Sequence, residues 1–454
     1  MKKTRKPLQW LMYTIAIGVL IFGTIGLVYF AQGYSYDFKS GQIRNSGLVL
    51  IDSHPNGASI SLNGKSISDK TPYRYDNATG GDISVNLQKN GYRDWTTKQT
   101  VVPGEVTFIE YPLLLPNNLP RQQIAEPVTL SGLNNDFEHK KAVSVSGQKD
   151  VYFITENGTA TRIYSAGVNT IDSAEISPDG NRALISQTNT DSSINQILVS
   201  TNGATVINLT AQYGFVFSNL QFSPQNSADL FWLENGLVRK IDTNNKSISS
   251  ALLSDVISYS LSRDRIIATL PGTIPSLTNM IVSTNLSGGD RYDVAALPAD
   301  LLGYNAILVH SRFHTYLAVL ANSEPKKLYY IYEPLSRNAL PFKIADNVTF
   351  FSASPKQKFL TYLTTDGIHS IDLETNREYH HALDTKPITA INWFDDYHVI
   401  LQAGTVGTII DFDGYNQQVI TTNSTPGYLL PNDSKSLLYL DLAKGMEKVF
   451  LEAK

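Results

Sequence analysis

Hydrophobic residues follow one pattern near the N-terminus and another through the rest of the chain. The 23 residues Leu8–Phe30 contain no charged side chain, and a basic cluster, Lys2 to Lys6, precedes them. A helix of this length spans the roughly 30 Å of hydrocarbon in a bilayer. From Gly47 onward, apolar and polar residues alternate in short runs, which is typical of β-strands with one buried face.

The flanks of the apolar run predict its orientation in a membrane. Basic residues favour the cytoplasmic side, so we expect residues 1–7 to form a cytoplasmic tail and the bulk of the chain to be extracytoplasmic. Aromatic rings near both ends favour the headgroup region. We expect a transmembrane helix over residues 8–30, with four anchor residues: Leu8, Trp10, Tyr29 and Phe30.

A cleaved signal peptide is the alternative interpretation of the same segment. Ala31-Gln32-Gly33 offers small residues at a suitable spacing for cleavage. The apolar run, however, is longer than the roughly 7–15 residues of a signal-peptide core. An uncleaved anchor is therefore favoured, and cleavage stays open.

Short strands joined by tight turns are predicted from Gly47 to Leu115. Leu48–Ile51 is a compact apolar strand, and the stretches around Ile60 and around Val85 alternate apolar with polar residues. Asn63-Gly64 and Asn90-Gly91 suit type I′ hairpin turns, whose two central residues both need φ > 0. So many corners predict a small antiparallel β-sandwich.

The same stretch, residues 47–115, resembles the PEGA domain, a small β-sandwich of prokaryotic surface proteins. The name motif stands as Pro55-Asn56-Gly57-Ala58, with Asn56 in place of the family's Glu. Further matching fold-motif residues are Asn63, Gly64, Thr71, Pro72, Gly91 and Tyr92. The resemblance implies an extracytoplasmic envelope module that attaches to surface layers or other proteins, with motif residues that shape the fold and do not catalyse.

Two connecting segments flank this predicted sandwich. Residues 31–46 are polar and contain glycine, and we expect them to form a tether. Residues 116–136 contain Pro116, Pro120 and Pro127, and show little alternation. Proline fixes φ, so this stretch is expected to be a stiff linker.

A weak repeat runs through residues 137–454. One unit, Ser177-Pro178-Asp179-Gly180, has the residue order of a type I turn. Partial copies follow, spaced 37 to 49 residues apart, with these seven markers in all: Ser177, Ser223, Ser262, Ser311, Ser354, Phe394 and Pro431. A strand–turn–strand unit with a period near 40 is typical of four-stranded propeller blades.

This half resembles the periplasmic Tol-type and WD-like β-propellers, whose blades carry the same turn. Seven markers favour seven blades, and six or eight stay open. Residues 151–164 are expected to close the ring against residues 437–451. The predicted fold class is an all-β ectodomain, a PEGA-like sandwich followed by a β-propeller, behind one transmembrane helix.

Charge and composition limit the partners. The chain has 37 basic and 41 acidic residues, and four of the basic ones and none of the acidic ones lie in residues 1–36. Residues 37–454 therefore carry 33 basic against 41 acidic residues, a formal charge of −8. This excess, without any basic run, argues against nucleic acid as a partner. The chain has no cysteine, which excludes disulfides and thiolate chemistry.

No combination of residues predicts a catalytic, cofactor or metal site. His310 and His314 have zinc-ligand spacing but lie between strand-like runs, and the adjacent His380 and His381 would point to opposite sides of a strand. Asp395-Asp396 and the stretch 411–414 are better explained as turns. Ser146 to Lys149 matches S-x-x-K without its companion motifs.

The sequence thus favours a binding role over an enzymatic one. We expect a single-pass envelope protein whose sandwich attaches to envelope or surface-layer material, and whose propeller binds a protein or glycan partner. An exported hydrolase with its site in the propeller channel is the alternative. A third interpretation is a spacer without any specific ligand. The partner and the oligomeric state stay open.

Overall fold

The structure is a computed structural model of the whole chain. It describes residues 6–31, 34–37, 42–125, 130–136, 141–155, 159–272, 278–298, 304–310, 312, 314–321, 325–332, 341–382, 387–433, 435–441 and 444–451. The chain divides into two compact units, one within Met1–Leu119 and the other Pro120–Leu451. Each unit has its own hydrophobic core and its own sheets.

The N-terminal segment forms one helix, α1 (Lys6–Ala31), which contains all four predicted anchor residues. Its stretch Trp10–Tyr29 has a mean hydropathy of 2.2 and none of it is buried against protein. The exposed side chains include Trp10 and Tyr29. The helix is thus long and apolar enough to cross a membrane.

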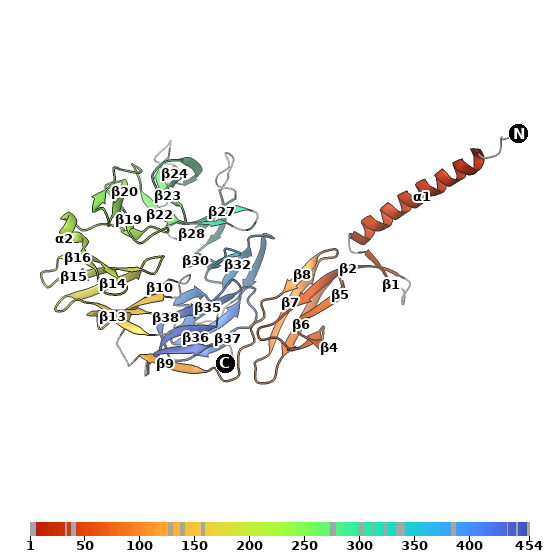
Figure 1. Cartoon of the computed structure of the whole chain (residues 1–454), viewed down its shortest axis with the longest axis horizontal. Helices are drawn as coiled ribbons and strands as arrows, with labels where there is room; N and C mark the ends of the chain where they lie inside the picture. The colour runs from red at the N-terminus through yellow and green to blue at the C-terminus, as the bar shows by residue number, and fades with distance from the viewer. Residues whose placement is uncertain are drawn as a thin grey trace. The chain divides into compact units, whose positions relative to one another are not determined.

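The rest of the first unit has two four-stranded sheets (Figure 1). In the first, β2 (Gln42–Ile51) pairs with β5 (Tyr73–Thr79) on one side, and with β1 (Tyr34–Asp37) and β8 (Val106–Ile109) on the other. The second sheet has the order β4-β3-β6-β7, with the bounds β3 (Ser59–Leu62), β4 (Lys65–Lys70), β6 (Gly81–Gln88) and β7 (Trp95–Val101). Both sheets contribute to one core, which includes Val49, Ile51, Ile60, Val85, Leu87 and Trp95.

Two expectations for this unit need correction. The predicted tether, residues 31–46, contains β1 and the start of β2, whose mainly polar composition hides their pairing. Asn63 and Gly64 both have positive φ, as the type I′ turn requires, but at the second turn only Gly91 does. There the N–H of Tyr92 donates to the carbonyl of Lys89. Six residues separate β6 from β7, so no two-residue hairpin is needed.

The sequence motifs of the first unit meet in space. The hydroxyl of Thr71 lies 2.6 Å from that of Ser53 and accepts a hydrogen bond of 3.0 Å from the N–H of Ala58. The N–H of Gly57, where φ is +84°, donates to the carbonyl of Thr71. Thr71 and Ser53 are buried, so each hydroxyl satisfies backbone groups that water cannot reach. The motif therefore joins two turns within the sandwich.

The second unit is a β-propeller. Within the described residues it forms eight four-stranded sheets, each with its strands in chain order except the last. Their bounds are: β10 (Leu130–Asp136), β11 (Lys141–Ser146), β12 (Asp150–Ile154), β13 (Ala160–Ser165); β14 (Thr170–Ile176), β15 (Arg182–Thr188), β16 (Ile194–Ser200), β17 (Val206–Asn208); β18 (Gln221–Phe222), β19 (Asp229–Glu234), β20 (Leu237–Asp242), β21 (Ser247–Ile248); β22 (Ser258–Ser262), β23 (Arg265–Pro271), β24 (Thr278–Asn285), β25 (Tyr292–Pro298); β26 (Tyr304–His310), β27 (Thr315–Ala321), β28 (Lys327–Tyr332), β29 (Pro341–Asp346); β30 (Phe350–Ala353), β31 (Phe359–Leu363), β32 (Ile368–Asp372), β33 (Arg377–His381); β34 (Ala390–Trp393), β35 (His398–Ala403), β36 (Val406–Asp411), β37 (Gln418–Thr421); and β38 (Ser424–Asp433), β39 (Ser436–Asp441), β40 (Gly445–Phe450), β9 (Arg121–Ala125). A short helix, α2 (Leu209–Tyr213), capped by Asn208, follows β17.

In several pairs of neighbouring sheets the first strands contact each other, as β10 does β14 and β22 does β26, and the first strand of the first sheet, β10, contacts that of the last sheet, β38. The sheets therefore close into a ring, with these first strands innermost. The final sheet is completed by β9, which comes from the start of the unit and pairs with β40. Residues 151–164, which were expected to close the ring against residues 437–451, belong to the first sheet, where Ile154 and Ala160 pack with Leu438 and Met446 of the last sheet. The expected linker, residues 116–136, instead contains β9 and β10.

The described residues contain one more sheet than the seven that the markers favoured. Ser177, Ser223, Ser354 and Phe394 each lie between the first and second strands of a sheet, from the second sheet onward. Ser311 lies outside the described residues. The first sheet has no Ser-Pro marker in its sequence, so a count of markers misses it.

Two of the Ser-Pro turns, at Ser177 and Ser354, share one hydrogen-bond pattern. The buried hydroxyl of Ser177 accepts from the N–H of Arg182, and that of Ser354 accepts from the N–H of Phe359. The N–H of Gly180 donates to the carbonyl of Ser177 over 2.8 Å, as in a type I turn. Gly180 has φ +64°. The carboxylate of Asp179 also accepts from the N–H of Ser227 in the next sheet.

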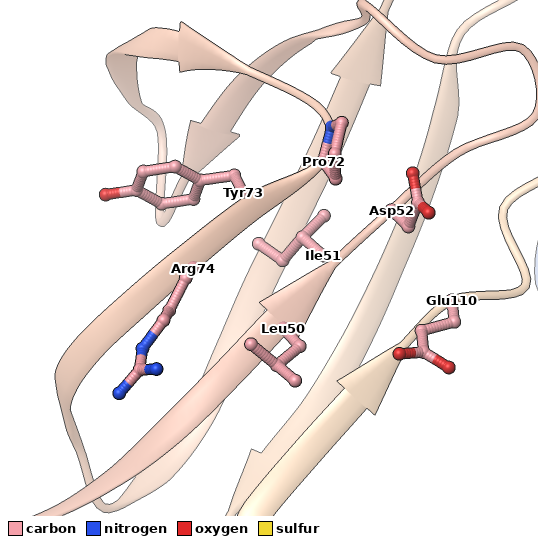
Figure 2. Close-up of a pocket in the computed structure, with 7 residues that line it drawn as sticks. All are labelled: Leu50, Ile51, Asp52, Pro72, Tyr73, Arg74 and Glu110. Atoms are coloured by element: carbon pink, nitrogen blue, oxygen red, sulfur yellow. The ribbon is translucent and has the colours of Figure 1, made fainter.

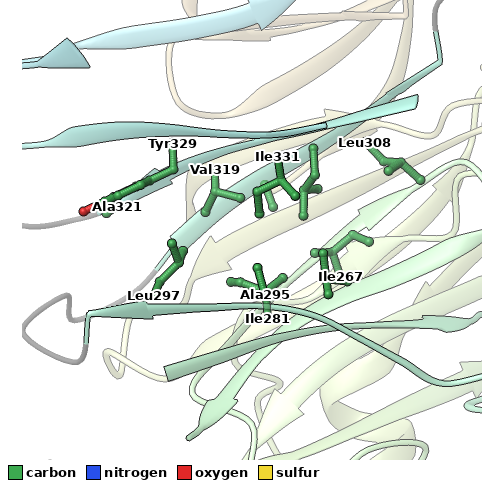
Figure 3. Close-up of a cluster of buried hydrophobic side chains, with 12 residues drawn as sticks. Ile267, Ile281, Ala295, Leu297, Leu308, Val319, Ala321, Tyr329 and Ile331 are labelled. Carbon is green, nitrogen blue, oxygen red and sulfur yellow. The ribbon is translucent and has the colours of Figure 1, made fainter. Parts of the chain in front are cut away.

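The hydrophobic core of the ring lies between the sheets. On β27, Leu317, Val319 and Ala321 pack against the preceding sheet, in a cluster that also contains Ile267 and Ile281 (Figure 3). The intervening residues of the same strand, Tyr316, Ala318 and Leu320, pack with residues of the following sheet. Both faces of β27 are therefore buried.

Candidate functional site

The outer face of the first sheet is one candidate site. On β2, Val49 and Ile51 point into the core, so the alternate residues Leu48 and Leu50 lie on the opposite face. Leu48 and Leu50 are register partners of Val106 and Phe108 on β8. We name these four residues, Leu48, Leu50, Val106 and Phe108, the apolar face.

The apolar face is accessible to solvent in the first unit. Phe108 is 59% exposed and Val106 is 42% exposed, whereas Leu48 and Leu50 are half-buried. Contiguous exposed apolar residues on a sheet are typical of an interaction site.

Charged residues border the apolar face. Arg74 on β5 is the register partner of Leu50 and forms an ion pair of 2.7 Å with Asp76. Arg74 and Glu110 lie on either side of Leu50, where a pocket of about 240 Å³ opens (Figure 2). The pocket is lined by Leu50, Ile51, Asp52, Pro72, Tyr73, Arg74 and Glu110. An apolar centre with a charged rim is the usual composition of a protein-binding surface.

A second candidate site lies in the propeller, on the sheet β30–β33. Asp366 in the β31–β32 turn, His369 on β32 and His380 on β33 place one ligand atom each within 4.8 Å of the others. We name these three residues the histidine cluster. The register pairs His369 with His380, so both imidazoles lie on one face of the sheet, with ring centroids 4.5 Å apart.

Neighbouring side chains orient the histidine cluster. Nδ1 of His369 lies 3.2 Å from Oε1 of Glu378, which in turn accepts a hydrogen bond of 2.5 Å from the hydroxyl of Tyr362. A hydrogen bond from Thr364 and further polar contacts lower the pKa of Asp366, which keeps this carboxylate charged. Burial and the neighbouring Glu378 raise the pKa of Tyr362, which keeps that hydroxyl protonated and able to donate.

Among the described residues at the centre of the ring, Glu175 has a carboxyl group with a perturbed pKa. Glu175 lies on the innermost strand β14, where solvent reaches it, but the surrounding protein desolvates the side chain and raises its pKa. Its charge also acts on Tyr259 of another innermost strand, β22. Among the described residues, no titratable side chain forms an ion pair or hydrogen bond with the carboxyl group of Glu175.

The other sequence candidates occupy structural positions. Ser146 to Lys149 forms the hairpin between β11 and β12, with positive φ at Gly147 and Gln148. In the stretch 411–414, the N–H of Gly414 donates to the carbonyl of Asp411, which confirms the predicted turn. His310 ends β26, where Nδ1 lies 3.1 Å from the hydroxyl of Thr315.

Asp395 is a turn residue with a second contact. Its carboxylate accepts from the N–H groups of Tyr397 and His398, as a turn residue does, and also lies 2.8 Å from Nδ1 of His398. Burial opposes the charge of His398, but Asp395, Asp411 and Asp413 raise its pKa to about 9. Because His398 is 5% exposed, this group is structural.

Sequence reasoning missed the histidine cluster. In the sequence, His380 stands next to His381, and adjacent residues of a strand point to opposite sides of it. Asp366 and His369 lie three residues apart and could have been noticed as a pair. Their meeting with His380 depends on the register of β32 and β33, which a single sequence does not reveal.

Comparison with known proteins identifies the sandwich. Residues 46–115 match the model of the PEGA domain. The PEGA match thus covers the strands from the end of β2 to β8, and it includes all the fold-motif residues from Pro55 to Tyr92. Among curated proteins, none matches the chain.

Several solved structures resemble the propeller at low identity. One is the C-terminal WD40 domain of Sif2, with 11% identity, a TM-score of 0.47, and 73% of this chain and 99% of that chain covered. Another is dipeptidyl peptidase 4 of Porphyromonas gingivalis, with 12% identity, a TM-score of 0.47, and coverage of 70% and 56%. A third is oligogalacturonate lyase from Vibrio parahaemolyticus, with 12% identity, a TM-score of 0.44, and coverage of 73% and 97%. The propeller assignment itself rests on the sheet topology and on the ring closure.

Proposed function

We propose that this protein is a single-pass, membrane-anchored binding protein of a prokaryotic cell envelope. In this proposal α1 anchors the chain, residues 1–7 stay in the cytoplasm, and the PEGA domain and the propeller lie outside the membrane. The PEGA domain attaches to envelope or surface-layer material, and the propeller binds a protein or glycan partner. The exposed apolar face of the PEGA domain is the observation that carries the proposal.

The apolar face supports attachment for an energetic reason. Each exposed apolar side chain that a partner covers contributes about 25 cal/mol per Å² of surface removed from water. Val106 and Phe108 are alternate residues of β8 on the same face of the sheet, and their register partners on β2 are Leu48 and Leu50. A partner can therefore cover all four side chains at once. The ion pair of Arg74 and Asp76 at the rim adds specificity more than affinity.

A sedimentation assay with isolated cell-wall and surface-layer fractions tests this proposal. The full-length protein in detergent is mixed with these fractions, and the retained fraction is measured for the wild type and for Phe108→Ser. We expect retention of the wild type and a decrease of roughly tenfold in apparent affinity for the variant, because aromatic anchors dominate such surfaces. Phe108 is 59% exposed, so the substitution leaves the PEGA core intact.

Val168→Ser is the matched control. Val168 is also an exposed apolar residue, at 78%, but it lies in a turn of the propeller. Equal retention of the two variants, or no retention of the wild type, would contradict the proposed role of the apolar face.

The proposed membrane topology is checked with single cysteines, since the natural chain has none. Val168→Cys should react with an impermeant maleimide on intact spheroplasts, and Thr4→Cys should not.

A further inference from the structure

We propose that Asp366, His369 and His380 form a binding site for a divalent cation of the zinc class. This inference is independent of the proposed envelope attachment, because it concerns a different unit of the chain. It rests on the spacing of three ligand atoms, on the hydrogen bond that orients one imidazole, and on a backbone that brings the turn close to the strand.

The spacing of the ligand atoms fits a metal better than direct hydrogen bonds. Oδ1 of Asp366 lies 3.5 Å from Nε2 of His369, and Oδ2 lies 3.6 Å from Nε2 of His380. Both distances exceed the roughly 2.7–3.2 Å of a nitrogen–oxygen hydrogen bond. Zinc bonds of about 2.1 Å in tetrahedral geometry place neighbouring ligands roughly 3.4 Å apart. The contacts are therefore too long for hydrogen bonds and close to the separation of ligands around one ion.

The partner of His369 provides the second argument. A metal-binding imidazole usually donates its other N–H to a carboxylate, which fixes the tautomer and directs the free nitrogen to the metal. Here Nδ1 of His369 lies 3.2 Å from Oε1 of Glu378, and the hydroxyl of Tyr362 donates to the same oxygen. The ring of Tyr362 stacks on that of His369 at 4.7 Å with an angle of 6° between the planes. Nε2 of the same ring lies 3.1 Å from the hydroxyl of Thr364 and 3.5 Å from Oδ1 of Asp366, so it faces the turn that contains both residues.

The backbone of the β31–β32 turn lies very close to strand β33 at Gly367. A Cβ on Gly367 would lie 2.2 Å from the carbonyl oxygen of His381 and 3.0 Å from Nε2 of His380. Only glycine therefore allows the β31–β32 turn to bring Asp366 next to β33. The same turn is stabilised by Thr364, whose N–H donates to the carbonyl of Gly367 and whose hydroxyl donates to the carboxylate of Asp366.

The ligand types and their exposure indicate the class of ion. Two imidazoles and one carboxylate suit zinc and similar transition metals, whereas magnesium and calcium prefer oxygen ligands. The side chains of His369, His380 and Asp366 are 14%, 45% and 65% exposed, so an ion can enter from solvent. Three protein ligands leave a fourth position for water or for a donor group of another molecule.

Titration of the untagged, full-length protein in detergent with cobalt(II) tests this inference. Cobalt(II) replaces zinc in such sites, and its visible absorption reports coordination number and ligand type. We expect a saturable signal at one ion per chain, displaced by zinc. His380→Gln should weaken binding at least tenfold, because it removes one of three ligands. A polyhistidine tag must be absent, since it would bind the same ions.

His314→Gln is the matched control. It removes an imidazole from the neighbouring sheet and should leave the cobalt titration unchanged. Glu378→Gln removes no ligand, but it should weaken binding about tenfold by releasing Nδ1 of His369. Circular dichroism of each variant verifies the fold. Absence of a saturable cobalt signal in the wild type, or equal affinities for the wild type and His380→Gln, would overturn the inference.

Discussion

The two units of this protein bury their strands differently. In the PEGA domain, β6 alternates between exposed and buried residues, so each sheet has one face toward the core and one toward solvent. In the propeller, β27 and β31 have almost every residue buried, because each sheet is packed between two others. The sandwich therefore offers whole sheet faces to a partner, whereas the propeller offers its turns and outer strands. The apolar face lies on an open sheet face of the PEGA domain, and the histidine cluster lies on a turn and on the third and fourth strands of a propeller sheet.

The largest expected change is in the free energy of unfolding, and it distinguishes a residue on a buried sheet face from one on an open face. Ile331 on β28 is fully buried between two propeller sheets, whereas Phe108 lies on the open face of the PEGA domain. We expect Ile331→Ala to lower the free energy of unfolding by about 2–5 kcal/mol, because it leaves a cavity. Phe108→Ala should change it by about 0.5 kcal/mol or less. Calorimetry of the full-length protein measures both, and equal effects would contradict the comparison.

A second prediction concerns buried charge. Among the described residues, the buried polar side chains of the first unit are uncharged, whereas those of the propeller include His398, Asp411 and Glu447. The pKa of His398 is raised from 6.5 to about 9, so the protonated form stabilises the fold below about pH 6.5 and this contribution is lost as the pH rises through about 9. The loss is on the order of 3 kcal/mol.

Thermal unfolding measured between about pH 6 and pH 9 checks this prediction. The transition of the propeller should move to lower temperature as the pH rises, while that of the PEGA domain should move less. In His398→Gln the propeller transition should lose most of this pH dependence. The same pH dependence in the variant would assign the effect to other groups.

A third, smaller change in stability tests the contacts that hold β9 in the last sheet and so close the ring. Without this closure, the first and last sheets would each expose one face to solvent. Arg121 on β9 donates to the carbonyl of Ile420 over 2.7 Å and lies 3.7 Å from the buried carboxylate of Glu447. We expect Arg121→Ala to lower the free energy of unfolding by about 2 kcal/mol, because it removes the donor to the carbonyl of the buried Ile420 and a positive charge beside Glu447. Arg291→Ala is the control, since its ion pair with Asp293 is exposed and should contribute less than about 1 kcal/mol. Denaturant unfolding compares the two variants, and equal midpoints would argue against Arg121 as a closing contact.

Local patterns in the sequence predicted most of the architecture. The uncharged run Leu8–Phe30 predicts a helix of membrane-spanning length, and alternation around Val85 predicts strands with one wet face. The turn residues Asn63, Gly64 and Gly180 have the positive φ that their glycine-rich motifs suggest. These features depend on residues close in the chain, so the sequence itself contains the necessary information.

Only the tertiary structure decided which distant strands meet. The pairing of β9 with β40 and the contact of β10 with β38 close the ring between strands about three hundred residues apart, and no local pattern encodes such a pairing. The apolar face depends on the parallel pairing of β2 with β8, and the histidine cluster depends on the register of His369 and His380. Side-chain chemistry is written in the sequence, but the placement of one strand beside another results from packing over the whole chain, and that placement decides which side chains become neighbours.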